Sequence, residues 1–153
     1  MRTLFTLRVF AVSKQVSYPM WTCPKCERVF KTENQSHYCG VTTLDDLFEG
    51  VPAHLVLAFD RLIATVIDWE PCSLGAAKKA AVFSSRKAWL IVRPMSKVLD
   101  LKFYTDHKIS SPDIFKVQPW GKKFAHHIRI KDESELTLEV LSLLREGHRF
   151  SMQ

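Results

Sequence analysis

The chain has 153 residues, and 46% of them are hydrophobic, so it can form one ordinary folded domain and is not wholly disordered. The formal net charge is +6, but half of this excess lies in residues 1–19, so the charge of the remaining chain does not by itself predict nucleic-acid binding. No apolar run reaches the roughly 18 residues that a membrane-spanning helix needs, so we expect no transmembrane segment and no membrane partner.

Residues 1–19 form a basic, acid-free and partly apolar leader whose role the sequence leaves open. It could be a targeting peptide, although Arg8 interrupts its apolar stretch and no small-residue cleavage site is clear. It could instead precede a natural start at Met20, or form a strand or arm that packs on the rest of the protein. We treat it as a leader or upstream extension and assign it no function.

Residues 20–41 contain a cysteine–histidine cluster with the spacing of a zinc site. Cys23 and Cys26 are separated by two residues, and His37 and Cys39 follow after ten intervening residues. Three thiolates and one imidazole suit tetrahedral Zn²⁺. We therefore predict that these four side chains bind one zinc ion, the alternative being cysteines that bind no metal beside an unrelated histidine.

The spacing of the second pair of ligands excludes a classical zinc finger. His37 and Cys39 are two positions apart, so on a helix they would point about 200° away from each other and must instead come from a turn or extended segment. Protein ligands fill all four coordination positions, which indicates a structural zinc with no position open to a substrate. Asn34 and Gln35 are candidates for orienting the ligands through hydrogen bonds. Because thiolate ligands persist in a reducing compartment, we expect the protein in the cytoplasm.

Basic side chains recur within this cluster. Lys25, Arg28 and Lys31 lie among the predicted metal ligands and are candidate nucleic-acid contacts. Glu27 and Glu33 interleave with them and dilute their positive field, so an ordinary solvated surface is the preferred interpretation. The aromatic residues that would act as platforms for bases are Trp21, Phe30 and Trp89.

Two helices are predicted after the cluster. Thr42 and Asp45 resemble a capping box, followed by a short helix that ends near Gly50. Pro52 suits the first turn of a longer helix. This second helix extends to Ile67, because apolar residues recur at three- and four-residue steps over about four turns.

Short β-strands are predicted in the second half of the chain, after a loop over residues 72–79. The alternation of apolar and polar residues is typical of strands with one buried face, and it places Leu99 and Phe103 on one face of the sheet and Asp100 and Lys102 on the other. The candidate strands are Ala80–Phe83, Ala88–Val92, Val98–Tyr104, Ile114–Val117, which should stop at Pro119, and Phe124–Ile130.

The order of these elements predicts an α+β fold, with an antiparallel β-sheet flanked by two main helices and preceded by a small zinc knuckle or ribbon. Asp132 and Glu135 are expected to cap the last helix, which should end at Gly147. The chain is thus divided into a leader, a zinc knuckle and an α+β domain, at residues 1–19, 20–41 and 42–153.

The cysteine–histidine cluster in residues 20–41 has a specific sequence arrangement: W-x-C-P-x-C, then F, then N-Q-x-H-x-C. It is carried by Trp21, Cys23, Pro24, Cys26, Phe30, Asn34, Gln35, His37 and Cys39. With this knuckle the chain resembles the domain of unknown function 5655 family. Softer similarities over the rest of the chain are Gly50-Val51-Pro52, Arg86-Lys87-Ala88-Trp89, the strand at Leu99, the Ala125-His126 pair and the final helix.

The resemblance extends from residue 20 to about residue 147. It implies a compact α+β domain with a helix-flanked antiparallel sheet, and it implies no established activity. Members of this family begin near Trp21, which supports Met20 as the natural start. Gly147-His148 stands where the family leads us to expect a small residue followed by an aromatic one, so a different docking of the last turn is expected.

Three further side chains are candidates for chemistry. His126 shares a face with apolar neighbours, so it is either a core histidine with its hydrogen bonds satisfied or, together with Trp89, part of a ligand pocket. His127 faces the other way beside Arg129 and is expected to be solvated. Cys72 is expected to be a buried small residue rather than a nucleophile.

No glycine-rich phosphate loop, nucleophile elbow or pair of catalytic carboxylates is present in the sequence, so we assign no catalytic residue and favour a protein that is not an enzyme. The sequence favours a non-catalytic binding or adaptor module with a structural zinc, whose partner is a protein or a nucleic acid. The alternatives are a nucleic-acid-binding module that uses the basic knuckle, and a small enzyme with a pocket around His126.

Overall fold

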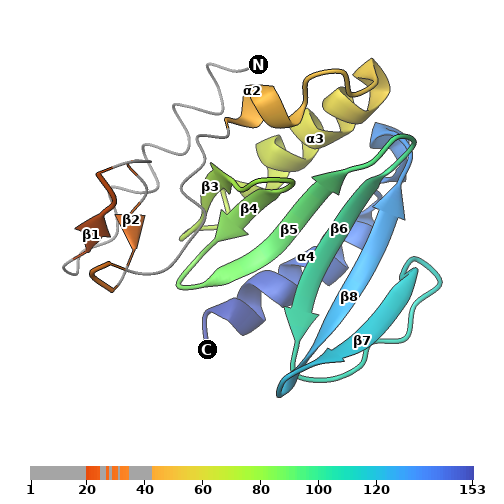
Figure 1. The fold of residues 1–153 in the computed structure, drawn as a ribbon. Coiled ribbons are helices and arrows are strands. Elements are labelled where there is room, and N and C mark those ends of the chain that lie inside the picture. The colour runs from red at the N-terminus through yellow and green to blue at the C-terminus, as the bar shows by residue number, and fades with distance from the viewer. Residues whose placement is uncertain (1–19, 25–26, 28, 31, 35–42) are drawn as a thin grey trace.

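A computed structural model describes residues 20–24, 27, 29–30, 32–34 and 43–153. Within them, a six-stranded antiparallel sheet is covered on one face by two long helices, α3 (Ala53–Val66) and α4 (Leu138–Ser151) (Figure 1). The strands of this sheet are β3 (Ser73–Ala76), β4 (Ala81–Ser84), β5 (Ala88–Pro94), β6 (Leu99–Thr105), β7 (Lys116–Trp120) and β8 (Lys123–Ile130). The predicted α+β class is therefore confirmed. None of the described helices is long and apolar enough to cross a bilayer.

The order of strands across the sheet is β3-β4-β5-β6-β8-β7. The chain forms a meander from β3 to β6, crosses to the edge of the sheet through residues 106–115, and returns as β8 between β6 and β7. The prediction that the strand stops at Pro119 is wrong, because β7 continues through it to Trp120. Since β7 has a neighbour on one side only, it can include a residue without an amide hydrogen.

The first short helix, α2 (Leu44–Leu47), begins one residue later than predicted. Its capping box joins Thr43 and Asp46: the Asp46 amide donates to Thr43 Oγ1 at 3.1 Å, and the Thr43 amide donates to Asp46 Oδ2 at 3.2 Å. The prediction of Thr42 and Asp45 is thus wrong by one position. The tandem threonines and aspartates allow both registers in the sequence, and the fold selects the second.

The long helix α3 confirms the predicted amphipathic pattern. Its apolar side is buried against the sheet and supplies Leu55, Ala58, Phe59, Leu62, Ile63 and Val66 to the core. The Phe59 ring stacks on Phe48 with 4.4 Å between centroids and meets Phe83 of β4 edge-on at 6.2 Å. These contacts attach the helix and the segment before it to one face of the sheet.

The last helix begins later than the sequence suggests. Asp132 caps a short 3₁₀ helix, η1 (Glu133–Glu135), by accepting the Ser134 amide at 2.9 Å. Thr137 is the true cap of α4 and accepts the Val140 amide at 3.2 Å. The predicted capping role of Asp132 for the long helix is therefore wrong, because the 3₁₀ turn intervenes.

Gly147 lies inside α4 and does not end it, so that prediction is also wrong. A Cβ at this position would lie 3.1 Å from both Cβ and Cδ2 of Phe103, so the glycine allows the helix to approach β6 closely. His148 beside it is buried, and its ring meets Trp89 in a T-shaped contact with 5.1 Å between centroids. Gly147 and His148 therefore dock the last turns of α4 on the sheet.

Strand β3 was predicted to be part of a loop. It pairs with β4 from Ser73 to Ala76 at one edge of the sheet. Only Leu74 of this strand is buried, so its four residues carry a weak apolar pattern. Pairing with β4, rather than local sequence, makes this segment a strand.

Near the start of the described residues, β1 (Trp21–Thr22) pairs with β2 (Val29–Phe30) in a small separate sheet. The Trp21 and Phe30 rings lie opposite each other with 6.0 Å between centroids. The Glu27 amide donates to the Cys23 carbonyl at 2.7 Å, and Glu27 has a φ of 61°. A turn closed by this hydrogen bond therefore follows Cys23, and Glu27 at its end has a left-handed backbone conformation.

Candidate functional site

Alternating residues divide the central strands between two faces of the large sheet. In β6, Leu99, Leu101 and Phe103 face the helices and belong to the hydrophobic core. Asp100 and Lys102 point to the opposite face, as the sequence predicts. We call this second face the open face, because none of the described helices covers it (Figure 1).

The positive charge of the sheet lies on the open face. The lysines and arginines within strands β3–β8 all share this face by register, and they are Arg93, Lys102, Lys116, Lys123 and Arg129. Within the same strands Asp100 is the only acidic residue, and it lies on this face as well. The open face therefore carries an excess of positive charge on a rigid support.

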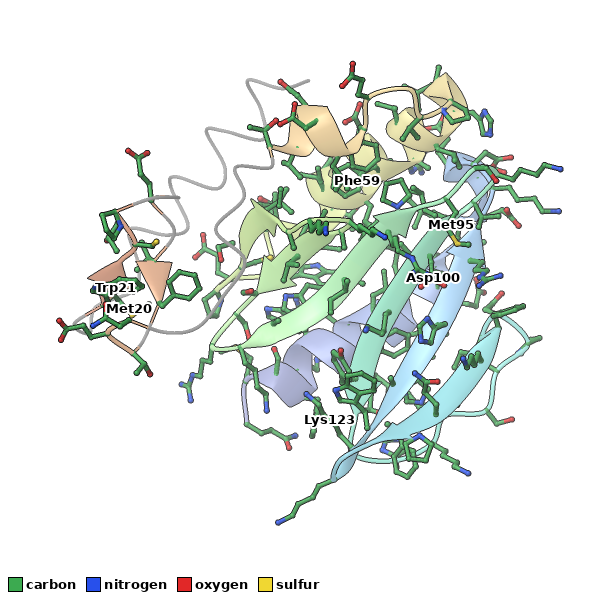
Figure 2. All side chains as sticks on the ribbon, viewed as in Figure 1. Met20, Trp21, Phe59, Met95, Asp100 and Lys123 are labelled. Carbon is green, nitrogen blue, oxygen red and sulfur yellow. The ribbon has the colours of Figure 1, made fainter. Side chains whose placement is uncertain are left out.

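Two lysines and two aromatic rings form a cation–aromatic cluster on the open face, consisting of Lys102, Tyr104, Trp120 and Lys123. Lys123 Nζ lies 4.0 Å from the centroid of the Tyr104 ring, and Lys102 Nζ lies 5.0 Å from that of Trp120. The two ring centroids are 6.5 Å apart. Each ammonium can interact with the π-electrons of a ring. The Trp120 side chain remains 49% exposed, so part of its ring is accessible. Figure 2 labels Lys123 within this region.

A tight hairpin turn holds two members of this cluster in place. Trp120 and Lys123 are cross-strand partners in β7 and β8. Of the two residues between them, Gly121 has a φ of 66° and Lys122 does not have a positive φ, which is the pattern of a type II′ turn with glycine first. The turn therefore presents the indole and the ammonium side by side on one face.

The cluster disfavours the charged form of one of its lysines. Partial burial lowers the pKa of Lys123, and the nearby charges of Lys87 and Lys102 lower it further. An anion bound at this position would offset the repulsion among these ammonium groups. The arrangement is thus electrostatically suited to a negatively charged ligand.

A polar network lies next to the cluster on the same face. The Asp100 carboxylate, 4% exposed, contacts His127 Nδ1 at 3.0 Å through Oδ2 and accepts a hydrogen bond from Arg129 Nε at 3.3 Å through Oδ1. The expectation that His127 is solvated is wrong, because its side chain is only 16% exposed and is held by Asp100. Arg129 also covers the Phe115 ring, with Cζ 4.1 Å from the centroid. This network holds the side chains of His127 and Arg129 in place.

His126 was a candidate for a ligand pocket, and the structure encloses it in the core at 0% exposure. Its Nε2 accepts the Ile109 amide at 3.1 Å, and its ring stacks on Phe103 with 5.0 Å between centroids. Burial lowers the pKa of this imidazole. Ile109 belongs to the segment that crosses from β6 to β7, so His126 attaches that segment to the sheet and has the geometry of a core histidine.

Trp89, the second pocket candidate, is 1% exposed. Its ring packs against Trp69 and His148, with centroid distances of 5.9 and 5.1 Å. A register shift between β4 and β5 lies next to it, which lets Trp89 join Leu90 on the helix side of the sheet. It therefore cannot act as an exposed aromatic platform, and that suggestion is wrong.

Cys72 confirms the prediction of a buried small residue. It is fully enclosed, and burial raises the pKa of its thiol to about 12. The thiol therefore stays protonated near neutral pH, whereas a nucleophilic cysteine needs a thiolate.

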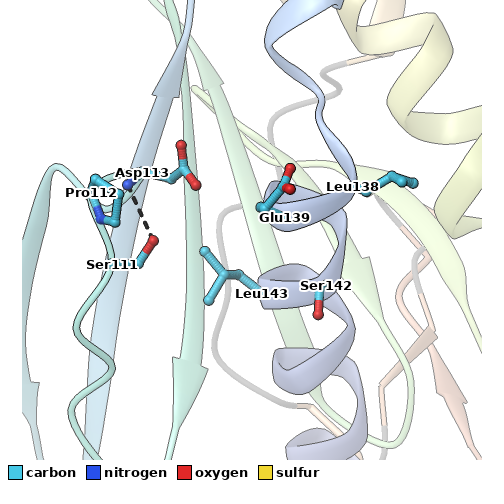
Figure 3. A pocket seen from close by; sticks show the side chains of 7 residues that line it. All are labelled: Ser111, Pro112, Asp113, Leu138, Glu139, Ser142 and Leu143. Atoms are coloured by element: carbon cyan, nitrogen blue, oxygen red, sulfur yellow. Dashed lines mark hydrogen bonds between the residues drawn. The ribbon is translucent and has the colours of Figure 1, made fainter.

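A shallow groove of about 440 Å³ lies between the crossing segment and the first turns of α4 (Figure 3). Asp113 lies on one side of it and Glu139 on the other, and the Asp113 amide donates to Ser111 Oγ at 3.2 Å. The complete lining is Ser111, Pro112, Asp113, Leu138, Glu139, Ser142 and Leu143. This lining contains hydroxyls and carboxylates but neither histidine nor cysteine, so it lacks the base that usually activates a nucleophile. Its negative charge contrasts with the open face.

The predicted zinc and nucleic-acid residues lie mostly outside the described part of the chain. Cys23 is described and is 3% exposed, and Asn34 is described with a φ of 55°. Outside the described residues lie Cys26, His37, Cys39, Gln35, Lys25, Arg28 and Lys31. Among the residues that the structure does describe, no group of three or more histidine, cysteine or acidic side chains could hold a metal ion.

Sequence reasoning missed the cation–aromatic cluster. The alternation around Lys102 predicts that this lysine lies on the face opposite the core, but it does not predict its aromatic neighbours. The predicted strand does not include Trp120, because Pro119 is expected to end it. A Gly121-Lys122 dipeptide between Trp120 and Lys123 could have indicated a two-residue hairpin turn.

A comparison with family models finds that residues 44–151 match Domain of unknown function (DUF5655). The match covers most of the chain, which therefore belongs to this family. It runs from the first residue of α2 to the last residue of α4, so it includes the whole six-stranded sheet. The search of curated proteins and the search of solved structures each return no match.

Proposed function

We propose that this protein is a non-catalytic binding module that holds an anionic partner on the open face of its sheet. The observation that carries the proposal is the segregation of charge within β3–β8: all lysines and arginines of these strands share one face with a single acid, Asp100. The acid already contacts His127 and Arg129, so it offsets little of the remaining field. Complementary charge would then recruit and orient the partner.

The buried positions of His126, Trp89 and Cys72 support a binding role over an enzymatic one. These three side chains are enclosed in the core, where they contribute to packing. The basic side chains, by contrast, stand on strands whose neighbours fix their spacing. A rigid surface of this kind is suited to recognition rather than to proton or group transfer.

The proposal is tested by measuring binding of fluorescein-labelled heparin, a generic polyanion, at several salt concentrations. The double variant Lys102→Glu/Lys123→Glu should bind at least about tenfold more weakly and should show a shallower salt dependence, because it loses counterion-releasing contacts. The matched control Lys79→Glu/Lys131→Glu makes the same charge change at exposed lysines outside strands β3–β8 and should lose much less. Absence of binding at low salt, or equal losses in the two variants, would refute the proposal.

We further propose that Cys23, Cys26, His37 and Cys39 bind one structural zinc ion. The burial of Cys23 and the tight turn closed by the Glu27 amide support this, because such a turn can bring two thiolates to one metal. The two-residue strands β1 and β2 bury too little surface to be stable without an additional cross-link. Bound zinc would supply that cross-link, with Asn34 and Gln35 as candidates for orienting the ligands.

Elemental analysis of the purified protein tests the zinc site. We expect about one zinc per chain, a loss of zinc in Cys23→Ser, and retention in the matched control Cys72→Ala, since Cys72 lies in the core of the large sheet domain. A zinc content near zero in the unmodified protein, with no change in stability for Cys23→Ser, would contradict the prediction.

A further inference from the structure

We infer that the anionic partner of the open face is single-stranded nucleic acid, with a base stacked on Trp120 and phosphates held by Lys102 and Lys123. This inference rests on the proposed function and specifies its ligand. The cation–aromatic cluster combines the two groups that such a ligand needs, a flat ring and ammonium groups within reach of it.

The exposure of Trp120 is the first reason. A tryptophan that only filled space would be covered, but this one is 49% exposed at the edge of the sheet. Lys102 Nζ lies 5.0 Å from the ring centroid, and Tyr104 lies next to the same ring. These neighbours support the indole while leaving part of it accessible. A base can stack on such a ring whatever its sequence, because every base has a π-face.

The charge around the indole is the second reason. Lys123 is the cross-strand partner of Trp120, and its depressed pKa reflects partial burial and the proximity of Lys87 and Lys102. The Lys102 and Lys123 ammonium groups lie on the two neighbouring rings of the cluster, so a phosphodiester bound there would offset their mutual repulsion. An acidic polypeptide would also relieve this repulsion, but it would leave the exposed indole unused.

A second exposed ring lies immediately before the edge strand β7. Phe115 is 60% exposed and is covered on one side by Arg129, with Cζ 4.1 Å from its centroid. Phe115 lies five positions before Trp120, about 16 Å of extended chain, and the alternation of side chains does not place the two rings on one face. Lys116 lies on the open face between them. Within β7, Lys116 and Trp120 therefore share the open face, along which an extended strand of nucleotides can run.

Unpaired bases fit this surface better than a duplex does. In a duplex the bases are stacked on one another, so their faces are not available to Trp120. A single strand can place its bases on the rings while its phosphates contact Lys102, Lys116 and Lys123. We therefore expect a preference for single-stranded over double-stranded ligand of the same length.

The test compares four fluorescent probes with the full chain: dT12, a 12-base-pair duplex, heparin and polyglutamate. Trp120→Leu should weaken binding of dT12 by roughly tenfold while leaving heparin binding within about twofold, because it removes the ring and keeps the charge. Trp120→Phe should retain most of the dT12 affinity. Leu138→Ala, a change at an exposed apolar residue on α4, is the matched control, and circular dichroism checks that each variant folds.

The outcomes separate the two proposals. Binding of heparin and dT12 with a Trp120→Leu loss confined to dT12 supports both. Heparin binding without a preference for dT12 over duplex, or with no effect of Trp120→Leu on dT12, overturns the nucleic-acid inference and leaves the anionic binding module standing. Preferential binding of polyglutamate also overturns it, in favour of an acidic protein partner. Failure to bind any of the four at low salt overturns both.

Discussion

The two faces of the six-stranded sheet are built from alternate residues of the same strands, yet they are buried in different ways. On one face Leu99, Leu101 and Phe103 are covered by helices. On the other, Asp100 and Tyr104 are also buried, but neighbouring basic and aromatic side chains cover them rather than a second layer of structure. Burial alone therefore does not distinguish core from surface in this sheet, whereas the chemistry of the covering groups does.

This difference separates stability from binding. A side chain under a helix makes many apolar contacts that cannot rearrange freely, so its loss leaves a cavity. A side chain under lysines is covered by flexible groups that can move away and expose it to a ligand. The helix-covered face is thus expected to dominate folding, and the open face is expected to tolerate changes that matter for recognition.

The largest effect is expected from Phe103→Ala on the helix-covered face. Phe103 is fully enclosed, stacks on His126 and contacts Gly147, so its loss should lower the free energy of unfolding by about 3–5 kcal/mol. Tyr104→Ala, the next residue but on the open face, should lower it clearly less. Chemical denaturation measures both. Equal losses would mean that the two faces contribute alike to stability.

A smaller effect is expected when the polar network of the open face is broken. Asp100→Ala leaves the part-buried His127, and the more exposed Arg129 beside it, without their acceptor, which should lower the free energy of unfolding by about 1–3 kcal/mol. Asp106→Ala is the matched control, because this exposed carboxylate contacts an exposed histidine and should change stability little. If the two variants were equally stable, the network would have no structural role.

Gly147→Ala tests the fit between α4 and the helix-covered face. The added Cβ would lie 3.1 Å from Phe103 Cβ, and this atom is fixed to β6, so overpacking should outweigh the higher helix propensity of alanine. We expect a net loss of about 1 kcal/mol, measured by thermal unfolding. Gly75→Ala in β3, with no atom within 4 Å of the added Cβ, should be close to neutral. A stabilised Gly147→Ala variant would show that the helix can move away from the sheet.

The smallest effect concerns acid sensitivity, which should arise from the helix-covered face. Burial lowers the pKa of His148 below its usual 6.5, so below about pH 6.5 the unfolded state binds more protons than the folded state. The free energy of unfolding should therefore fall as the pH drops through this range. His148→Phe should flatten this dependence. Denaturation curves between about pH 5 and 7 measure the slope, and unchanged slopes in His148→Phe would exclude this source.

Much of the fold could be predicted because its signals are local. The period of α3 and the alternation in β6 and β8 need only neighbouring residues, and the structure confirms them. The errors fall where a contact distant in sequence decides the outcome. The local sequence predicts that Gly147 ends the helix, but the close approach to Phe103 requires a glycine inside α4. It likewise predicts a loop for the residues of β3, which form a strand because β4 pairs with them.

The sequence by itself determined which residues of the central strands share a face, because side chains in a strand alternate with a fixed period of two. It thereby assigned Lys102 to the side opposite the core. Only the tertiary structure decided which strands lie next to each other. By placing β8 between β6 and the edge strand β7, it brings Trp120 and Lys123 beside Lys102 and Tyr104. The candidate site exists because pairing between distant strands, which no local pattern encodes, assembles it.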